Sequence, residues 1–65
     1  MARQTTAPRF LRLQEVRQMT YLGKTSIYAR INEGTFPRQI PIGSNSVVWL
    51  EKDVVAWMEK QMEEA

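Results

Sequence analysis

The side chains best able to make directional contacts with another molecule gather between residues 24 and 32. At helical spacing, one face of this stretch carries Thr25, Tyr28, Ala29 and Asn32. The opposite face carries Ile27 and Ile31, which favours burial of that side. The first face presents hydroxyl, carboxamide and methyl groups and no carboxylate, a combination that suits the base edges of a DNA groove. An ordinary surface helix has the same pattern, so the rest of the chain has to decide.

Each of these side chains has a specific candidate role and a plainer alternative. Asn32 can form two hydrogen bonds with adenine, and Ala29 can pack on a thymine methyl group beside Thr25. The alternatives are a helix cap next to Gly34 for Asn32 and an exposed filler for Ala29.

A second group of residues is placed to contact phosphates. Its members are Arg17, Lys24, Ser26, Tyr28, Arg30 and Arg38, and neutral contacts are added by Ser44, Asn45 and Ser46. Lys24 and Ser26 fall in the first turn of the predicted helix, where free backbone N–H groups favour an anion. Tyr28 can instead pack against the strand expected at residues 47–49, and Arg17 and Arg38 can equally be exposed without a role. Five or six phosphate contacts would give a log–log salt slope of about −5.

Composition excludes several classes of site. The chain has no cysteine and no histidine, which excludes disulfides, thiolate and imidazole metal ligands, cysteine nucleophiles and the commonest general base. Glu51 and Asp53 stand at a predicted helix start with no nucleophile or glycine-rich phosphate loop. We therefore expect no enzymatic activity, no metal and no cofactor. The N-terminus does not resemble a signal peptide and no apolar run approaches ~20 residues, which predicts a cytoplasmic protein without membrane contact.

Charge is unevenly distributed along the chain. Residues 1–38 hold seven basic and two acidic side chains, a net charge of +5, and residues 39–65 hold two basic and five acidic, a net charge of −3. A basic front and an acidic rear would orient the molecule near a polyanion.

Two short helices and a tight turn are expected to position the polar face. From Leu13, apolar residues recur at helical spacing until about Thr20. A turn of three or four residues follows, and a second helix begins between Gly23 and Thr25 and ends at Gly34. The pair forms a helix-turn-helix, in which the second helix is the one that reads DNA.

The second half of the chain predicts a β-hairpin and a third helix. Prolines at positions 37 and 41 make residues 36–42 an edge strand, residues 43–46 signal a turn, and residues 47–49 form a return strand. Helical spacing resumes over residues 51–63, with an apolar face of Leu50, Val54, Trp57, Met58 and Met62.

The expected fold is mainly α with a small β-hairpin, a winged helix-turn-helix with about three helices and a two-stranded wing. Residues 9–65 form this domain, and residues 1–8 are expected to be a disordered N-terminal arm. Arg3 and Arg9 can touch phosphates from that end of the chain. Much of the core is expected to come from Phe10, Phe36, Trp49 and Trp57.

A series of short motifs follows in order along residues 9–58. They are Leu13-Gln14-Glu15-Val16, Leu22-Gly23-Lys24-Thr25-Ser26-Ile27-Tyr28, Glu33-Gly34-x-Phe36-Pro37, Ile42-Gly43, Val48-Trp49 and Asp53-Val54-x-Ala56-Trp57. Each is weak alone, but together they resemble the AlpA family of prophage transcriptional regulators, relatives of excisionase-type and MerR-type winged-helix domains.

The resemblance implies a DNA-binding regulator of a phage, prophage or mobile element, with double-stranded DNA as partner. The helix at about residues 24–33 would enter the major groove, and the wing at residues 38–49 would lie on the adjacent backbone or minor groove. An excisionase that bends DNA at attachment sites and a small inhibitor of a partner protein remain alternatives. MerR-type proteins dimerise through a long C-terminal coiled coil that these residues do not include. We therefore expect a weak dimer or cooperative assembly on DNA, without a small-molecule effector.

The sequence departs from the family pattern at three places. The family usually has Gly where Tyr21 stands and Ser where Gly23 stands, and a tyrosine in a left-handed turn costs roughly 1 kcal/mol or more unless Gly23 takes up the bend. Where Ala29 and Arg30 stand, the family usually has Arg followed by an apolar residue. The usual arginine at the wing tip is replaced by residues 44–46, Ser-Asn-Ser. These departures bear on the DNA sequence read and on affinity.

Overall fold

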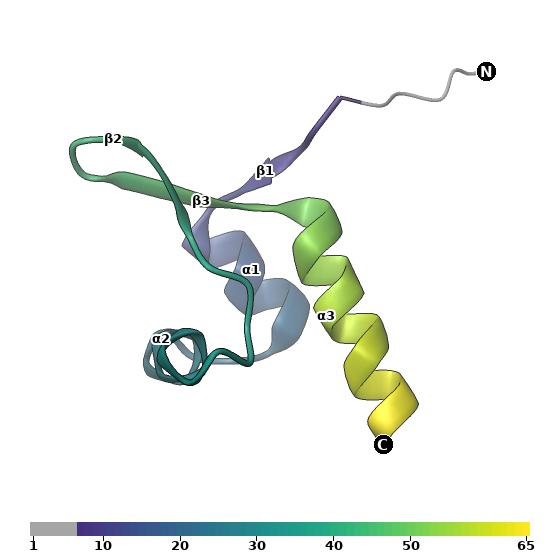
Figure 1. Ribbon diagram of the computed structural model, residues 1–65. Coiled ribbons are helices and arrows are strands. Elements are labelled where there is room, and N and C mark those ends of the chain that lie inside the picture. The colour runs from purple at the N-terminus through teal and green to yellow at the C-terminus, as the bar shows by residue number, and fades with distance from the viewer. Residues whose placement is uncertain (1–6) are drawn as a thin grey trace.

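Three helices lie on one side of a small sheet in the computed structural model, which describes residues 7–65 (Figure 1). The elements are β1 (Phe10–Leu11), α1 (Leu13–Thr20), α2 (Lys24–Glu33), β2 (Ile40–Gly43), β3 (Ser46–Leu50) and α3 (Glu51–Glu64). The predicted winged helix-turn-helix is confirmed, and the hairpin of β2 and β3 is its wing. Residues 1–6 of the expected arm lie outside the described residues, and Ala7 and Pro8 are exposed.

The turn between the two helices begins where hydrogen bonds of Thr20 and Tyr21 end helix α1. The Thr20 hydroxyl donates to the Val16 carbonyl at 2.8 Å and accepts from the Leu22 N–H at 3.3 Å. The Tyr21 N–H donates to the Arg17 carbonyl at 2.8 Å, which closes the last turn of α1. Helix α2 then begins at Lys24, at the predicted place.

Tyr21 takes up the bend between the helices. Its backbone is left-handed, with φ of 61° and ψ of 20°, whereas Gly23 is extended at φ of −78°. The tyrosine side chain is 93% exposed, so no packing offsets the strain of this conformation. The possibility that Gly23 absorbs the bend is therefore wrong.

The sheet has a third strand beside the predicted hairpin, β1, within residues 10–12, where the sequence indicates a very short strand or entry segment. Its order is β1-β3-β2, antiparallel throughout, with Phe10 opposite Leu50 and Ile40 opposite Val48. Past the end of β1–β3 pairing, the Glu51 N–H donates to the carbonyl of residue 9 at 2.8 Å. The chain before α1 is thus tied to the start of α3.

The core lies between the sheet and the helices. It is formed by Leu11, Val16, Ile27, Ile31, Phe36, Trp49 and Val54. Two of the expected contributions are wrong. Phe10 is 50% exposed because β1 turns it away from the helices, and Met62 is 70% exposed because α3 extends past the core. Trp57 and Met58 are half-buried against the core, as their places on α3 predict.

The connection from α2 to β2 is held by the two indoles. Gly34, at φ of 81°, ends α2 with N–H bonds from residues 34 and 35 back to the carbonyls of residues 31 and 30. The Trp57 Nε1–H then donates to the Thr35 carbonyl at 2.7 Å, and the Trp49 Nε1–H donates to the Pro37 carbonyl at 3.1 Å. These bonds set where the wing starts relative to α2.

Candidate nucleic-acid interface

The exposed face of α2 forms a shallow depression with no acidic side chain. It is lined by Lys24, Thr25, Tyr28, Ala29 and Asn32. The depression lies opposite Ile27 and Ile31, whose burial anchors the helix. The structure thus brings together the residues expected to read bases, and adds the ammonium group of Lys24 beside them.

Asn32 lies inside α2 and does not cap it. The cap is Gly34, and Asn32 is exposed with no hydrogen bond of its carboxamide among residues 7–65. Its two donors and its acceptor are therefore available to an outside partner.

Tyr28 both packs against the wing and lines the depression on α2. Its ring meets the Trp49 ring of β3 edge to face, with centroids 6.2 Å apart and an interplanar angle of 67°. It also lines the depression on α2. The packing alternative is therefore present in the structure, and the contact fixes the angle between α2 and the wing.

Ser26 and Arg30 lie on a different flank of α2. The Arg30 guanidinium carbon lies 6.0 Å from the centroid of the Trp57 ring of α3, a cation–π distance. Ser26, four residues earlier, shares that flank because residues i and i+4 stack on one side of a helix. Neither lines the depression, so the structure separates these two predicted contacts from Lys24, Thr25 and Asn32.

A second polar surface joins α1 to the wing tip. Arg12, Gln14 and Arg17 line one depression together with Asn45 of the hairpin turn. Gln14 and Arg17 also line the neighbouring depression that reaches the turn between α1 and α2. Arg17 and Asn45, predicted separately, are therefore neighbours.

The other wing residues are less closely grouped. Ser44 and Asn45 form the exposed hairpin turn, whereas Ser46 is half-buried in β3 opposite Gly43. Arg38 is exposed in the connection before β2.

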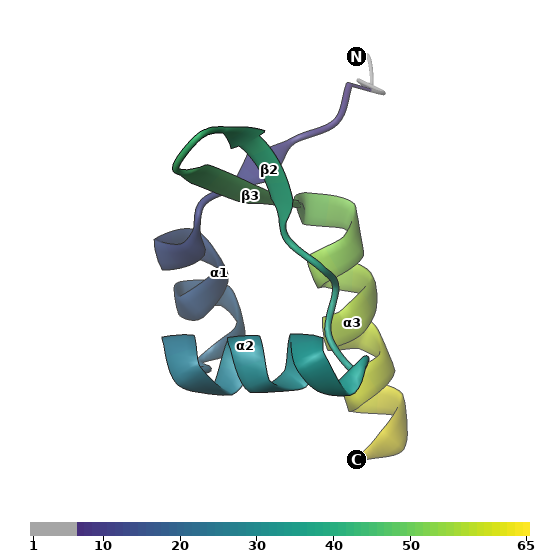
Figure 2. The ribbon, with the colours of Figure 1, turned by 60° about the vertical axis from the view of Figure 1, so that its left-hand side comes forward.

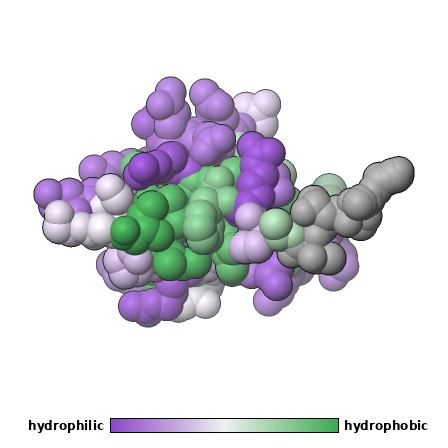
Figure 3. All heavy atoms as spheres, turned by 90° about the horizontal axis from the view of Figure 1, so that it is seen from above, coloured by the Kyte–Doolittle hydropathy of each residue, from purple (hydrophilic) through white to green (hydrophobic). Residues whose placement is uncertain are grey.

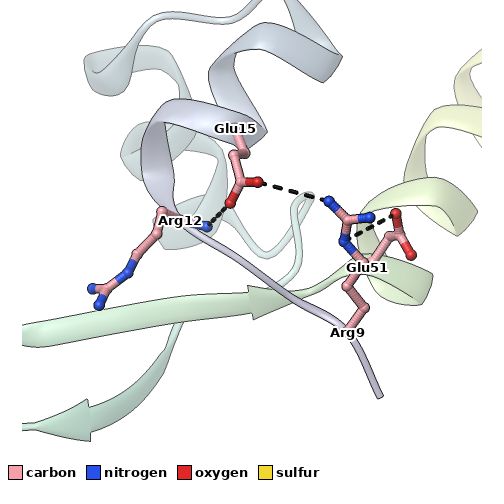
Figure 4. Close-up of polar contacts among 4 residues, drawn as sticks. All are labelled: Arg9, Arg12, Glu15 and Glu51. Carbon is pink, nitrogen blue, oxygen red and sulfur yellow. Dashed lines mark hydrogen bonds and ion pairs between the residues drawn. The ribbon is translucent and has the colours of Figure 1, made fainter. Parts of the chain in front are cut away.

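Ion pairs leave most of the basic side chains of this region unneutralised. Within residues 7–65, the only ion pairs join Arg9 to Glu15 and to Glu51, each at 3.7 Å (Figure 4). Glu15 also accepts from the Arg12 N–H at 2.8 Å, while the Arg12 guanidinium points away from both carboxylates (Figure 4). Arg9 thus has a role in tying β1 to α1 and α3, and four other cations keep their charge free: Arg12, Arg17, Lys24 and Arg38.

The wing and α2 are both exposed on the same side of the molecule. In Figure 2, α2 lies across the front and the hairpin stands in front above it, while α3 lies beside them. The exposed carboxylates of α3, among them Glu59, Glu63 and Glu64, belong to the acidic helix outside this surface. The arrangement separates the two signs of charge as the sequence predicts.

Three polar residues of this surface were not singled out from the sequence. Arg12, Gln14 and Gln18 line the two depressions on α1. The helical spacing of Gln14, Arg17 and Gln18 was a usable signal, because it places them on one face. No sequence signal indicates that Arg12 lies near Asn45, because their proximity depends on where the wing lies relative to α1.

No helix within residues 7–65 has the length and apolar character to cross a bilayer.

Known proteins resemble this chain over most of its length. The family model of the prophage CP4-57 regulatory protein (AlpA) matches residues 9–62. An uncharacterized protein of Enterobacteria phage P4, ORF88, is 43% identical over 53 residues, which cover 82% of this chain and 60% of that protein. The DNA-binding transcriptional activator AlpA of Escherichia coli (strain K12) is 32% identical over 62 residues, covering 86% of this chain and 89% of that protein. The chain therefore spans three-fifths of the first relative and most of the second.

Proposed function

The chain belongs to the AlpA family of prophage regulatory proteins, and from this premise we propose that it is a sequence-specific DNA-binding transcriptional regulator. Its ligand is double-stranded DNA, with α2 in the major groove and the β2–β3 wing on the adjacent backbone or minor groove. The observation that carries the proposal is the acid-free depression on α2, a helix that lies on the same side of the molecule as the wing (Figure 2).

The α2 face supplies the groups that distinguish base pairs. The major groove of B-DNA is about 12 Å wide and admits a helix. Asn32 offers a donor and an acceptor to adenine, Ala29 offers a methyl contact to thymine, and the Thr25 hydroxyl serves either role. These three side chains are exposed, so no part of the described fold has to move before they meet a base.

The free cations surround this face and contact phosphates. Lys24 stands in the first turn of α2, where backbone N–H groups add to the attraction for an anion. Arg17 approaches from α1 beside Asn45 of the wing, and Arg38 from the start of the wing strand. With Arg12 this makes four phosphate contacts, and counterion release then gives a log–log salt slope of about −3.6. Arg30 does not enter this count because it lies against Trp57.

The experiment is selection of bound duplexes from a random-sequence library, followed by titration of the selected site over a salt series. The test variant is Lys24→Ala and the matched control is Lys60→Ala, which removes the same charge from the exposed part of α3. Lys24→Ala should weaken binding to all sequences and make the slope shallower by about 0.9, whereas Lys60→Ala should leave the slope unchanged.

Base reading is tested separately with Asn32→Ala. Loss of a bidentate contact should reduce discrimination at one base pair by about 1–3 kcal/mol while leaving the salt slope as it was. Absence of binding at low salt would contradict the proposal. Salt-sensitive binding without sequence preference would contradict the regulatory role and favour an architectural one.

A further inference from the structure

The side of the sheet that faces away from the core is itself apolar. Side chains alternate along a strand, so Val47 and Trp49 of β3 pack toward the helices while Val48 and Leu50 point the other way. Directly paired residues share a face. Pairing and alternation therefore place Phe10, Ile40, Ser46, Val48 and Leu50 on the outer face, and Ile42 lies beside them where the register of β2 and β3 is irregular.

The apolar residues of this side form a patch that lies outside the core cluster, made up of Phe10, Ile40, Ile42, Val48 and Leu50. Val48 at its centre is 2% exposed and does not belong to the core cluster. Phe10 and Ile42 are each 50% exposed at its two ends. Figure 3 shows the patch from above as a hydrophobic area bordered by polar side chains. In the part of the chain that the structure describes, all three helices lie on the other side of the sheet (Figure 1).

The patch is suited to packing face to face rather than to adding a strand. On one edge of the sheet, Pro41 of β2 has no N–H to donate to a further strand. On the other edge, β1 is two residues long. Because neither edge of the sheet is suited to pairing with a further strand, a partner would cover this apolar face by packing its own surface against it.

The charged residues beside the patch indicate which kind of partner would pack against it. Next to Leu50, one depression is lined by Arg9, Glu51 and Lys52, and the Arg9–Glu51 ion pair spans part of it. A patch bordered by one sign of charge would select a partner of the opposite sign. A border with both signs is complementary to itself, because Lys52 of one copy can meet Glu51 of the other about a two-fold axis.

We propose that the outer sheet face is the surface through which two copies of this chain associate, in an isologous pair. The six residues before Ala7, Met-Ala-Arg-Gln-Thr-Thr, are an unsuitable cover, since only the first is a large apolar residue. Five apolar side chains make a small contact, so the pair is weak in solution. DNA carrying two neighbouring sites then strengthens it by raising the local concentration.

This inference goes beyond DNA reading and uses none of the side chains proposed to contact DNA, although Ile40, Ile42 and Val48 belong to the strands of the wing. The depression on α2 is lined by Lys24, Thr25, Tyr28, Ala29 and Asn32, none of which belongs to the patch. Self-association can therefore be measured on the protein alone, and its failure would leave the DNA proposal intact.

The experiment is sedimentation equilibrium of the full chain from about 10 μM to about 1 mM without DNA. The test variant is Ile42→Glu and the matched control is Met62→Glu, which adds the same charge at an exposed apolar residue of α3. The wild type and Met62→Glu should rise with concentration from 7.6 kDa toward twice that mass. Ile42→Glu should stay monomeric, with its dissociation constant raised at least tenfold.

A measurement on the wild type removes any dependence on how the variants fold. The methyl NMR signals of Ile40, Ile42 and Leu50 should shift with concentration, while those of Met62 should not. A wild type that stays at 7.6 kDa up to about 1 mM would overturn the proposal. So would equal association of the two variants, or self-association that begins only when residues 1–6 are deleted, because that segment would then be the natural cover.

Discussion

Replacing Tyr21 with glycine should stabilise this domain, although tyrosine has by far the larger side chain. Tyr21 has φ of 61°, a conformation that costs an L-residue about 1–2 kcal/mol relative to the right-handed region. Glycine adopts it freely, but it also gains about 0.4–1 kcal/mol of freedom in the unfolded chain. Little packing is lost, since the tyrosine side chain is 93% exposed. The net gain in free energy of unfolding should be about 0.5–1 kcal/mol.

The assay is thermal and urea unfolding of the wild type, Tyr21→Gly and Tyr21→Ala, followed by circular dichroism. For a domain of this size the glycine variant should melt about 2–8 °C higher than the wild type. Alanine removes the same aromatic ring but keeps an L-residue at positive φ, so Tyr21→Ala should lie within about 0.5 kcal/mol of the wild type.

The reasoning depends on the difference between the two variants. If Tyr21→Ala stabilises the domain as much as Tyr21→Gly, the gain comes from removing an exposed aromatic ring and not from the backbone. If both variants are destabilised, the tyrosine ring makes a contribution to the fold that its exposure does not show. Either result would refute the assignment of strain to this residue.

Three further substitutions test other parts of the fold. Gly34→Ala should lower the free energy of unfolding by about 1 kcal/mol because φ is 81°, even though the new Cβ meets no atom within 4 Å. The control is Gly23→Ala, at φ of −78°, which should leave the stability measured by urea unfolding unchanged. Trp57→Phe should lose about 1 kcal/mol in the same assay, since it deletes the indole bond to the Thr35 carbonyl and keeps an aromatic ring, and an unchanged stability would contradict the role given to that bond. Arg9→Ala should change the free energy of unfolding by less than about 1 kcal/mol, with the difference vanishing at high salt, because both of its ion pairs lie at the surface; a larger, salt-independent loss would show that its contribution is not electrostatic.

The helices and the hairpin could be predicted from the sequence because their signals are local. Apolar spacing defined the buried side of α2 at Ile27 and Ile31, and Gly34 marked its end. Two prolines and a polar turn defined the wing. Each of these features depends on residues within a few positions of one another, which is the range over which periodicity and turn chemistry operate.

What could not be predicted depends on contacts between distant parts of the chain. The sequence indicates a very short strand or entry segment at residues 10–12, but not its pairing, because the two residues of β1 are too few to show alternation and Phe10 pairs with the distant Leu50. That pairing turns Phe10 outward, so its expected place in the core is wrong. The sequence indicates a strained left-handed turn at Tyr21 or a bend at Gly23, and the structure has the left-handed conformation at Tyr21.

The candidate site shows the same division. The α2 face of Thr25, Ala29 and Asn32 follows from helical spacing alone, and the structure keeps it together. The position of Arg30 does not follow, because its cation–π contact with Trp57 requires α3 to lie beside α2. Helical spacing predicts which residues share a face of a helix, but it does not predict which other element that face contacts.

Trp49 connects the core of this domain to the relative position of α2 and the wing. Its side chain is fully buried, its Nε1–H is bonded to the Pro37 carbonyl, and its ring meets the edge of Tyr28 on α2. One residue of β3 therefore contacts both the connection leading into the wing and helix α2. Exchanges at Thr25, Ala29 or Asn32 leave this arrangement untouched, since those side chains have no part in the core. Such substitutions on the exposed face of α2 therefore leave in place the contacts that Trp49 makes with Tyr28 and with the Pro37 carbonyl.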